Sequence, residues 1–256
     1  MDPAVKGPTV TRESMLRKTT IVACAAVLLT GCSFFGGGLK EPASSGPSTA
    51  SGASGASTTS AATSTVDSIS PDKANSLIVP KKDVSDLVGS TLDYEGKASN
   101  PGSTTVDGKE SCRPLMVPLT NDIGDKWTTY RNVWYQESKD TFSHLVTQRV
   151  LLYPSRDDAK ETYAKEFAPD VRTCAGEELK TDTGTWRASV PEASEDHTRW
   201  VLDEIVDGQP SGWRCMAEAR TIDNLLLMAM NCQHGNGGPA VKAIMDRMVA
   251  GATKPR

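Results

Sequence analysis

Apolar and polar residues alternate with a period of two along several segments in the C-terminal two thirds of the chain, which predicts β-strands there. Residues 213–222 and 225–232 form two such runs, and Asp223 and Asn224 between them tolerate the positive φ of a two-residue hairpin turn. Further runs rich in aromatic and β-branched side chains are residues 127–136, 142–153 and 200–206. The pattern therefore predicts antiparallel strands that connect mostly as hairpins.

Three other segments place apolar residues three and four positions apart, the spacing of one face of a helix. They are residues 81–88, which Gly89 ends, the segment after Ser155, and residues 239–250. An acid follows Ser155 three residues later, as in a capping box. Pro169 is expected to kink or end that helix, because proline lacks the donor that a helix interior needs. Helices together with hairpin strands predict an α+β fold, an antiparallel sheet flanked by helices.

The register of the predicted hairpin decides how the four cysteines after residue 100 pair. If the residues that flank the turn pair with each other, Cys215 lies directly opposite Cys232 with Cα atoms about 4.5 Å apart, within disulfide range. Cys112 then pairs with Cys174 by exclusion, so two disulfides are expected, as in exported domains. The same register puts apolar side chains on the disulfide face and three polar ones on the other: Glu218, Arg220 and Asn231.

A rival interpretation of Cys232 is half of a metal site with His234, since thiolate and imidazole both bind zinc. The sequence contains no Cys-x-x-Cys pair, and His144 and His197 are distant from these residues along the chain. The sequence therefore predicts no metal site and no cofactor.

The N-terminal segment has the features of a lipoprotein signal peptide. Basic residues at 17 and 18 precede an apolar run, 21–29, and small residues stand just before Cys32. Nine apolar residues are too few for a membrane-spanning helix, which needs about 20. We therefore expect residues 1–31 to be removed, with translation starting at Met1 or Met15. Acyl chains on Cys32 then anchor the protein to the outer face of the plasma membrane.

Residues 32–76 are almost entirely Ser, Thr, Ala, Gly and Pro, a composition that does not bury enough apolar surface to fold. We expect a flexible tether with a reach of about 35 to 40 Å, and a glycosylated stalk is the alternative. Residues 77–252 then form one domain with a single core.

The charge of the chain excludes one class of partner. The formal net charge is -4, and the first 31 residues hold four basic and two acidic side chains, so the remainder carries -6. A net acidic chain is unsuited to general nucleic-acid binding, and we expect no nucleic-acid partner.

Aromatic side chains beside cationic ones suggest where a ligand binds. Five such residues lie within the predicted strand 127–136: Trp127, Tyr130, Arg131, Trp134 and Tyr135. His144 and Arg149 lie in the next predicted strand and are candidates for the same surface. Exposed aromatics beside arginine suit a polar ligand such as a sugar or cell-wall fragment. The alternative is that these aromatics belong to the core, as Trp and Tyr in strands usually do.

Catalytic motifs are missing from the sequence. It contains no Gly-x-Ser-x-Gly, no His-Glu-x-x-His and no intact phosphate-binding loop. A hydrolase would need a Ser/His/acid site assembled in space around His144 or His197. We therefore expect a protein that is not an enzyme and has no catalytic residues, with such a hydrolase as an alternative.

Four blocks of the chain together resemble the family of PknH-like extracellular sensor domains. They are the helix ending in Leu87-Val88-Gly89, the segment around Cys112, Val150-Leu151-Leu152-Tyr153-Pro154-Ser155 with the helix that ends near Cys174, and Trp213-x-Cys215 with Cys232. One departure is Val171-Arg172-Thr173, where the family pattern has a Trp.

The resemblance implies a sheet flanked by helices, two disulfides and a large cleft taken to bind an unidentified ligand. We therefore expect an exported, lipid-anchored, non-enzymatic domain that binds a small ligand or an envelope protein. An interaction scaffold or adhesin is the alternative.

Overall fold

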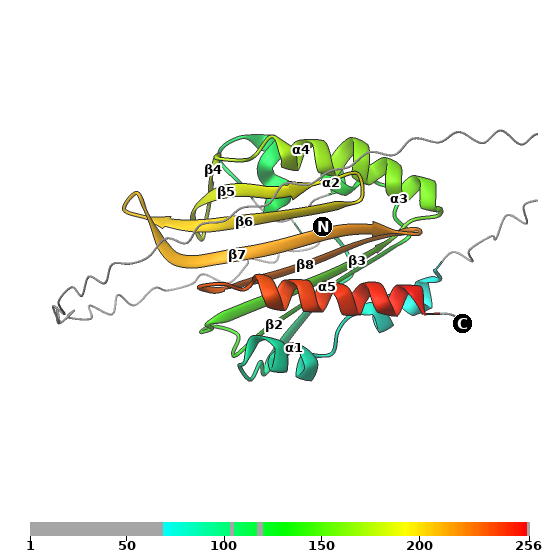
Figure 1. Cartoon of the computed structure of the whole chain (residues 1–256), viewed down its shortest axis with the longest axis horizontal. Coiled ribbons are helices and arrows are strands. Elements are labelled where there is room, and N and C mark those ends of the chain that lie inside the picture. Colours follow the sequence, from blue (N-terminus) through cyan, green and yellow to red (C-terminus); the bar gives the residue numbers. More distant parts are fainter. Residues whose placement is uncertain (1–68, 103–104, 117–119, 255–256) are drawn as a thin grey trace, which may run out of the picture. The chain divides into compact units, whose positions relative to one another are not determined.

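The structure, a computed structural model, describes residues 69–102, 105–116 and 120–254. The predicted signal peptide, the predicted lipidation site Cys32 and the predicted linker up to residue 68 lie outside these residues. The described chain forms one eight-stranded antiparallel sheet in the order β1-β2-β3-β8-β7-β6-β5-β4 (Figure 1). Helices lie on both faces of this sheet, which confirms the predicted α+β class.

Consecutive strands are hydrogen-bonded neighbours, except that β3 pairs with β8, and not with β4, in the middle of the sheet. The strands are β1 (Tyr94–Ala98), β2 (Thr129–Gln136), β3 (His144–Leu152), β4 (Glu178–Thr181), β5 (Gly184–Ala193), β6 (His197–Val206), β7 (Gln209–Ile222) and β8 (Leu225–His234). The sequence pattern located β2, β3, β6, β7 and β8 and missed the two edge strands and β5. These three lie toward the rims of the sheet, where fewer side chains are buried and the apolar pattern is weaker.

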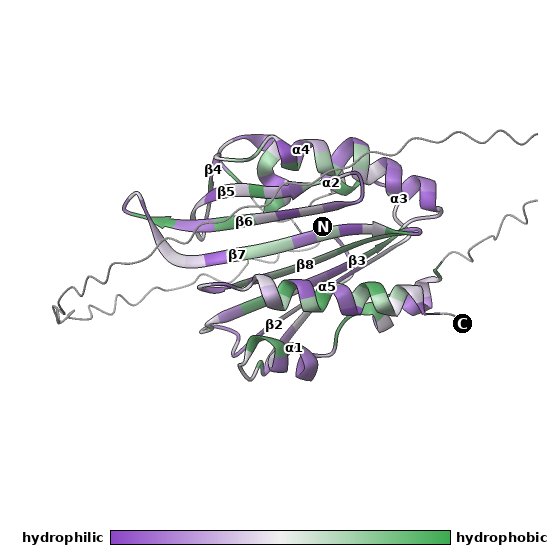
Figure 2. Cartoon of the chain, in the orientation of Figure 1, coloured by the Kyte–Doolittle hydropathy of each residue, from purple (hydrophilic) through white to green (hydrophobic). Residues whose placement is uncertain are grey.

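Each face of the sheet packs on its own set of helices. The first face is covered by η1 (Pro71–Leu77), α1 (Lys81–Val88) and α5 (Gly238–Thr253), and we call it the α5 face. The second is covered by η2 (Glu110–Leu115), α2 (Thr120–Ile123), α3 (Arg156–Thr162), the π-helical η3 (Tyr163–Phe167) and α4 (Ala168–Arg172), and we call it the α3 face. Apolar residues on α5 line the side that packs on the sheet (Figure 2). Two hydrophobic cores therefore stabilise the domain.

The β7–β8 hairpin has the register that its sequence predicts. Ile222 pairs with Leu225, and Cys215 pairs directly with Cys232. Disulfides join Cys215 to Cys232 and Cys112 to Cys174, as expected, with Cα atoms 3.8 and 5.5 Å apart respectively. Asp223 in the turn has a φ of 49°, the positive value that the turn requires.

The polar face of this hairpin is buried instead of solvated. Glu218 is 1% exposed and Asn231 is fully buried, although the alternation of the sequence predicts that one face of the hairpin is exposed to solvent. The reason is α5, which packs across β7 and β8 on that face. The pattern fixed which residues share a face but carried no information about what covers it.

The folded domain includes residues that the composition assigns to the linker. Ile69 is 5% exposed, and Pro71–Leu77 forms η1 within the stretch that was expected to be linker. Asn224, in the β7–β8 turn, accepts from the Ile69 amide at 2.9 Å and donates to the Ile69 carbonyl at 3.2 Å. These bonds are made by a residue 155 positions away, so local sequence did not indicate them.

The helical segment after Ser155 is capped as predicted but does not stop at Pro169. The Ser155 hydroxyl accepts from the Asp158 amide at 3.1 Å. The helix continues through the π turn, and Pro169 occupies the first turn of α4, where its missing donor is not needed. Among the described residues, the helices are all too short or too polar to cross a bilayer.

Candidate ligand-binding site

The predicted ligand residues divide between the two faces of the sheet. Tyr130, Trp134 and Arg149 lie on the α3 face, and Trp127, just before β2, packs on the Tyr130 ring with centroids 5.9 Å apart. The other three are on the α5 face: Arg131, Tyr135 and His144. Alternation along a strand makes this division unavoidable. The seven residues therefore do not form one surface.

Two of the three residues on the α5 face, Arg131 and Tyr135, contact η1 and the segment that follows it. Arg131 donates through Nε to Asn75 of η1 at 2.9 Å and through a terminal nitrogen to the Tyr130 carbonyl at 2.8 Å. The Tyr135 hydroxyl donates to the Val79 carbonyl at 3.3 Å. These contacts fix the chain that leads from η1 to α1, which is a structural role.

His144 belongs to a polar cluster at the β2–β3 turn. Its Nδ1 lies 2.6 Å from Glu137, which also accepts from Ser90 at 2.8 Å and from two backbone amides. Burial opposes ionisation of Glu137, but the hydrogen bonds from His144, Ser90 and the backbone outweigh it and lower the pKa of Glu137 to about 2. The cluster stabilises the turn.

Arg149 is the exceptional side chain of the α3 face. It is 6% exposed, and burial lowers its pKa from the usual value, while the neighbouring Tyr130 hydroxyl acts in the opposite direction. Its Nε has no hydrogen-bond partner. Arginine stays protonated in proteins, so this guanidinium is a buried positive charge. Burial likewise raises the pKa of Tyr130, and the Arg149 charge opposes that rise.

Two further unpaired polar atoms belong to Asn132, which neighbours Arg149, and to Trp127, which packs on Tyr130. Asn132 pairs with Arg149 across β2 and β3, and its Oδ1 is buried without a partner. The Trp127 indole Nε1 is also buried and unpaired. Sequence reasoning missed Asn132, although its alternation with Tyr130 and Trp134 places it on their face. We call the five residues Trp127, Tyr130, Asn132, Trp134 and Arg149 the Arg149 cluster.

Trp134 lies across the adjacent strand β1. It pairs with Gly96, and a Cβ built on Gly96 would stand 2.0 Å from Cε2 of the indole ring. The missing side chain of Gly96 therefore lets the ring lie flat on the edge strand. Trp127, Asn132 and Trp134 are each half-buried, so parts of these side chains reach the surface beside Arg149.

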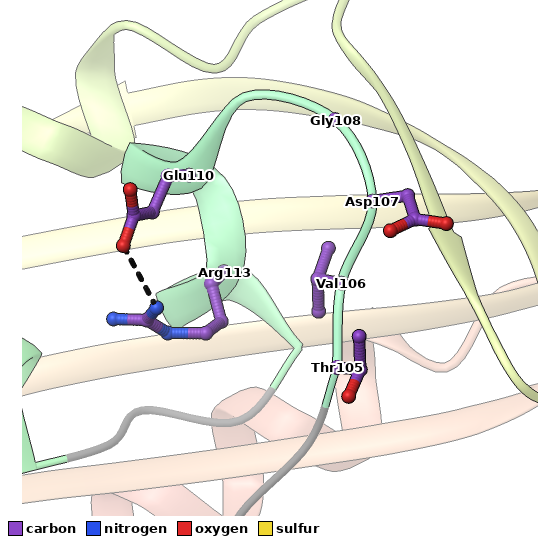
Figure 3. A pocket seen from close by; sticks show the side chains of 6 residues that line it. All are labelled: Thr105, Val106, Asp107, Gly108, Glu110 and Arg113. Atoms are coloured by element: carbon purple, nitrogen blue, oxygen red, sulfur yellow. Dashed lines mark hydrogen bonds and ion pairs between the residues drawn. The ribbon is translucent and has the colours of Figure 1, made fainter.

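Two surface cavities of the described chain do not include Arg149, although the first is lined by Asn132. One, of about 470 Å³, lies between η1 and strands β1 and β2 and contains Arg131 and Tyr135 together with Glu95 and Lys97. The other, of about 450 Å³, lies between residues 105–108 and η2 (Figure 3). Both combine acidic and basic side chains.

In the second cavity, Arg113 is engaged by carboxylates. It lies 3.5 Å from Glu110, the contact drawn in Figure 3, and 3.0 Å from Asp122. Its charge is therefore compensated within the protein.

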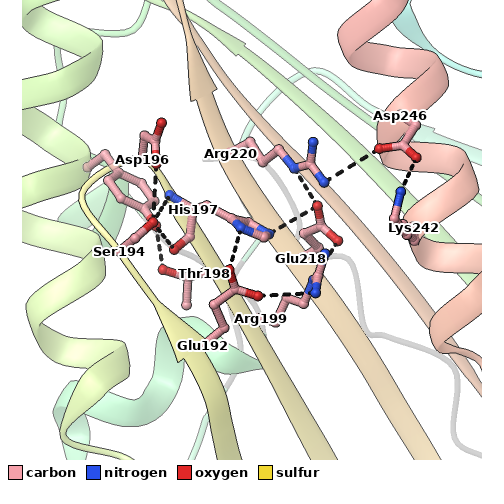
Figure 4. Close-up of polar contacts among 11 residues, drawn as sticks. Glu192, Ser194, Asp196, His197, Thr198, Arg199, Glu218, Arg220, Lys242 and Asp246 are labelled. Carbon is pink, nitrogen blue, oxygen red and sulfur yellow. Dashed lines mark hydrogen bonds and ion pairs between the residues drawn. The ribbon is translucent and has the colours of Figure 1, made fainter. Parts of the chain in front are cut away.

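A buried carboxylate organises the α5 face beside α5. Glu218 accepts from Arg199 at 3.1 Å and from Arg220 at 2.5 Å, and His197 Nε2 lies 3.1 Å away (Figure 4). Arg220 also reaches Asp246 of α5 at 3.5 Å. This network ties the last helix to the sheet and compensates the charge of Glu218.

Serine, histidine and acid side chains meet in two places, but in an order that does not suit hydrolysis. At the β2–β3 turn, the Ser90 hydroxyl donates to Glu137 and not to His144. Near β6, the Ser194 hydroxyl donates to Asp196 and to the His197 carbonyl. General-base catalysis needs the serine proton to face an imidazole nitrogen. Within the described residues, no three His, Cys, Asp or Glu side chains are grouped as metal ligands.

Comparisons with known proteins agree with the fold. Serine/threonine-protein kinase PknH of Mycobacterium bovis is 20% identical over 198 residues, which are 70% of this chain and 31% of the kinase. PknH of Mycobacterium tuberculosis is also 20% identical, with 30% of its length covered. This chain thus spans less than a third of these relatives. The crystal structure of the extracellular domain of PknH from Mycobacterium tuberculosis aligns with a TM-score of 0.63 at 16% identity, covering 73% of this chain and 98% of that domain.

The sequence profile of the PknH-like extracellular domain matches residues 69–250, which begin at the first residue that the structure describes. This match covers well over half of the 256 residues. It confirms the resemblance carried by the four sequence blocks. The chain therefore belongs to the family of PknH-like extracellular domains.

Proposed function

We propose that the protein is a lipid-anchored, non-enzymatic sensor domain of the cell envelope that binds a small polar ligand at the Arg149 cluster. The observation that carries the proposal is a set of three buried, unpaired polar atoms: Arg149 Nε, Asn132 Oδ1 and Trp127 Nε1. Asn132 pairs with Arg149 across β2 and β3, and Trp127 packs on Tyr130 of the same face. Buried polar groups in native proteins are nearly always hydrogen-bonded. Unpaired buried polar groups beside half-buried aromatic side chains are typical of a ligand-binding surface.

The aromatic members suit this role because of their positions. Trp127 and Trp134 flank the cluster, and flat rings of this kind stack on the faces of sugars and on apolar groups. Trp134 is held in place by its contact with Gly96. Two predicted residues, Arg131 and Tyr135, are engaged by backbone and side-chain partners, so the proposed site omits them.

The proposed membrane anchor rests on the signal-peptide features before Cys32, which are basic residues, an apolar run and small residues. Acylation there would attach the domain to the membrane from outside, with residues 33–68 as the spacer. The test is expression of wild type and Cys32→Ala in a mycobacterial host. The wild-type protein is expected in the membrane fraction, and the mass of its N-terminal peptide is expected to include the acyl chains. The variant is expected to lack these acyl chains. An unmodified N-terminal peptide from wild type contradicts the anchor.

Thermal unfolding of the full chain in detergent micelles tests ligand binding. All five tryptophans lie between residues 127 and 213, so intrinsic fluorescence reports on the folded domain. The panel contains cell-wall fragments, sugars, lipids and nucleotides. A ligand at 100 times its Kd adds about 2.7 kcal/mol, or about 5 to 10 °C in Tm.

A matched pair of variants locates the effect. Trp134→Ala removes an aromatic of the cluster, whereas Trp213→Ala removes one on β7, three strands away from β2, where it contacts Phe142 and His234. The ligand-induced shift is expected to shrink in the first variant and persist in the second. No shift with any member of the panel would overturn the proposal and favour an envelope protein as partner, as for a scaffold or adhesin.

A further inference from the structure

Arg149 differs from every other arginine that the structure describes. The others each contact a carboxylate or a carbonyl-type oxygen: Arg113, Arg131, Arg156, Arg172, Arg187, Arg199, Arg214, Arg220 and Arg247. Arg149 is near the centre of the sheet and more buried than these, yet it has the Tyr130 hydroxyl as its polar neighbour and no such oxygen. An uncompensated buried ion costs several kcal/mol, so this charge lowers the stability of the ligand-free domain.

The register shows what surrounds the guanidinium. Asn132 lies opposite it on β2 and Met228 lies opposite it on β8, while Thr147 and Leu151 are its neighbours on the same face of β3. None of these side chains is acidic. Among these strand neighbours, the guanidinium therefore has no acidic partner.

Donors outnumber acceptors in the cluster. Arg149 and the Trp127 indole only donate, Tyr130 supplies a hydroxyl proton, and Asn132 supplies an amide group with both functions. A ligand that satisfies the donors of Arg149 and Trp127 must offer acceptor oxygens, and the unpaired Oδ1 of Asn132 needs a donor in addition. The planar guanidinium pairs best with carboxylate or phosphate oxygens, which it binds in a bidentate manner.

We propose that the ligand of this site is an oxyanion, a carboxylate or a phosphate ester, joined to an apolar or ring-shaped body. Arg149 binds the anionic group, and Trp127 and Trp134 contact the body. The assignment rests on the proposed ligand-binding function and names the chemical class that this site selects. It also explains why Arg149 is tolerated, because the ligand supplies the charge that the protein omits.

Titration of the full chain with three related probes tests the charge requirement. Phenyl phosphate and benzoate carry the anionic group on a ring, whereas benzamide has the ring without the charge. The anionic probes are expected to raise Tm and benzamide is not, and the effect of the anions should weaken with added salt. Inorganic phosphate lacks the ring and tests whether the apolar body of the ligand contributes to its affinity. It is expected to bind more weakly than phenyl phosphate.

Three variants separate binding from folding. Arg149→Met keeps length and apolar bulk without charge, and its Kd for the better anionic probe is expected to rise about 10- to 100-fold. Arg149→Lys keeps the charge without the planar fork and should show an intermediate Kd. Arg187→Met removes an exposed arginine on β5 and should bind as wild type does.

Stability without ligand gives the second readout. Arg149→Met is expected to be at least as stable as wild type, because it removes an unpaired buried charge. A strongly destabilised Arg149→Met variant would overturn the inference, since the arginine would then be structural. Unchanged binding in that variant would also overturn it. If a neutral sugar from the wider panel stabilises the chain but the anions do not, the oxyanion assignment fails while ligand binding stands. If no compound binds, both fail.

Discussion

Gly96→Ala is expected to destabilise the domain through its contact with Trp134. The new Cβ would stand 2.0 and 2.1 Å from two ring carbons of the indole and 2.5 Å from its Nε1, far inside van der Waals contact. The ring must therefore leave its place on β1. Overpacking of this kind costs about 1 to 3 kcal/mol, which for a domain of this size lowers Tm by about 3 to 9 °C.

The assay is thermal and urea unfolding of the full chain, with Gly102→Ala as the matched control. A Cβ at Gly102 meets nothing within 4 Å and its φ is not in the left-handed region, so its cost is expected below about 0.5 kcal/mol. A double-mutant cycle with Trp134→Ala isolates the contact. The cost of Gly96→Ala should largely disappear when the indole is absent. An equal cost in both backgrounds would refute the reasoning.

Three further perturbations follow from the described contacts. The pKa of Glu137 is about 2 when folded against 4.5 for the free group, so its stabilising effect is present above pH 4.5 and is lost as the pH falls toward 2. Urea unfolding between pH 5 and 2.5 should show a smaller loss of stability in Glu137→Gln than in wild type, and parallel curves would contradict this. Removing Cys112–Cys174 by paired Ser substitutions is expected to cost about 4.3 kcal/mol, against about 3.1 kcal/mol for Cys215–Cys232, because the separations are 62 and 17 residues; the reverse order in chemical denaturation would refute the loop-entropy argument. Glu218→Gln should cost about 3 kcal/mol, since the side chain is 1% exposed among cations, whereas Glu192→Gln at 44% exposure should cost less than about 1 kcal/mol. Similar losses of stability in the two variants would show that burial of Glu218 does not increase its contribution to the stability of the domain.

The parts of the fold that the sequence predicted well are those set by short-range geometry. A two-residue turn and strict alternation determine the β7–β8 register, and the register then determines one disulfide and, by exclusion, the other. What covers each face depends on distant segments. The burial of Glu218 comes from α5, and the order at Ile69 comes from Asn224, so neither is encoded in local pattern.

The candidate site was predictable only in part for the same reason. The sequence placed aromatic and cationic side chains on β2 and β3, and alternation implied that some face each way. Which face carries unpaired groups depends on tertiary partners. Arg131 finds Asn75 of η1, whereas Arg149 finds no carboxylate among the described residues. The exceptional character of Arg149 is therefore a property of the fold and not of its strand.

The measurement that tests the central claim most directly is an NMR titration of the indole N–H signals with phenyl phosphate. The chain has five tryptophans, two in the Arg149 cluster and three elsewhere, at positions 186, 200 and 213. Single Trp→Phe variants assign each signal. The account predicts that the signals of Trp127 and Trp134 shift with the added probe while the other three stay in place, and that Arg149→Met abolishes the shifts. Chemical-shift changes confined to the signals of the other three tryptophans, or no chemical-shift changes at all, would contradict ligand binding at the Arg149 cluster.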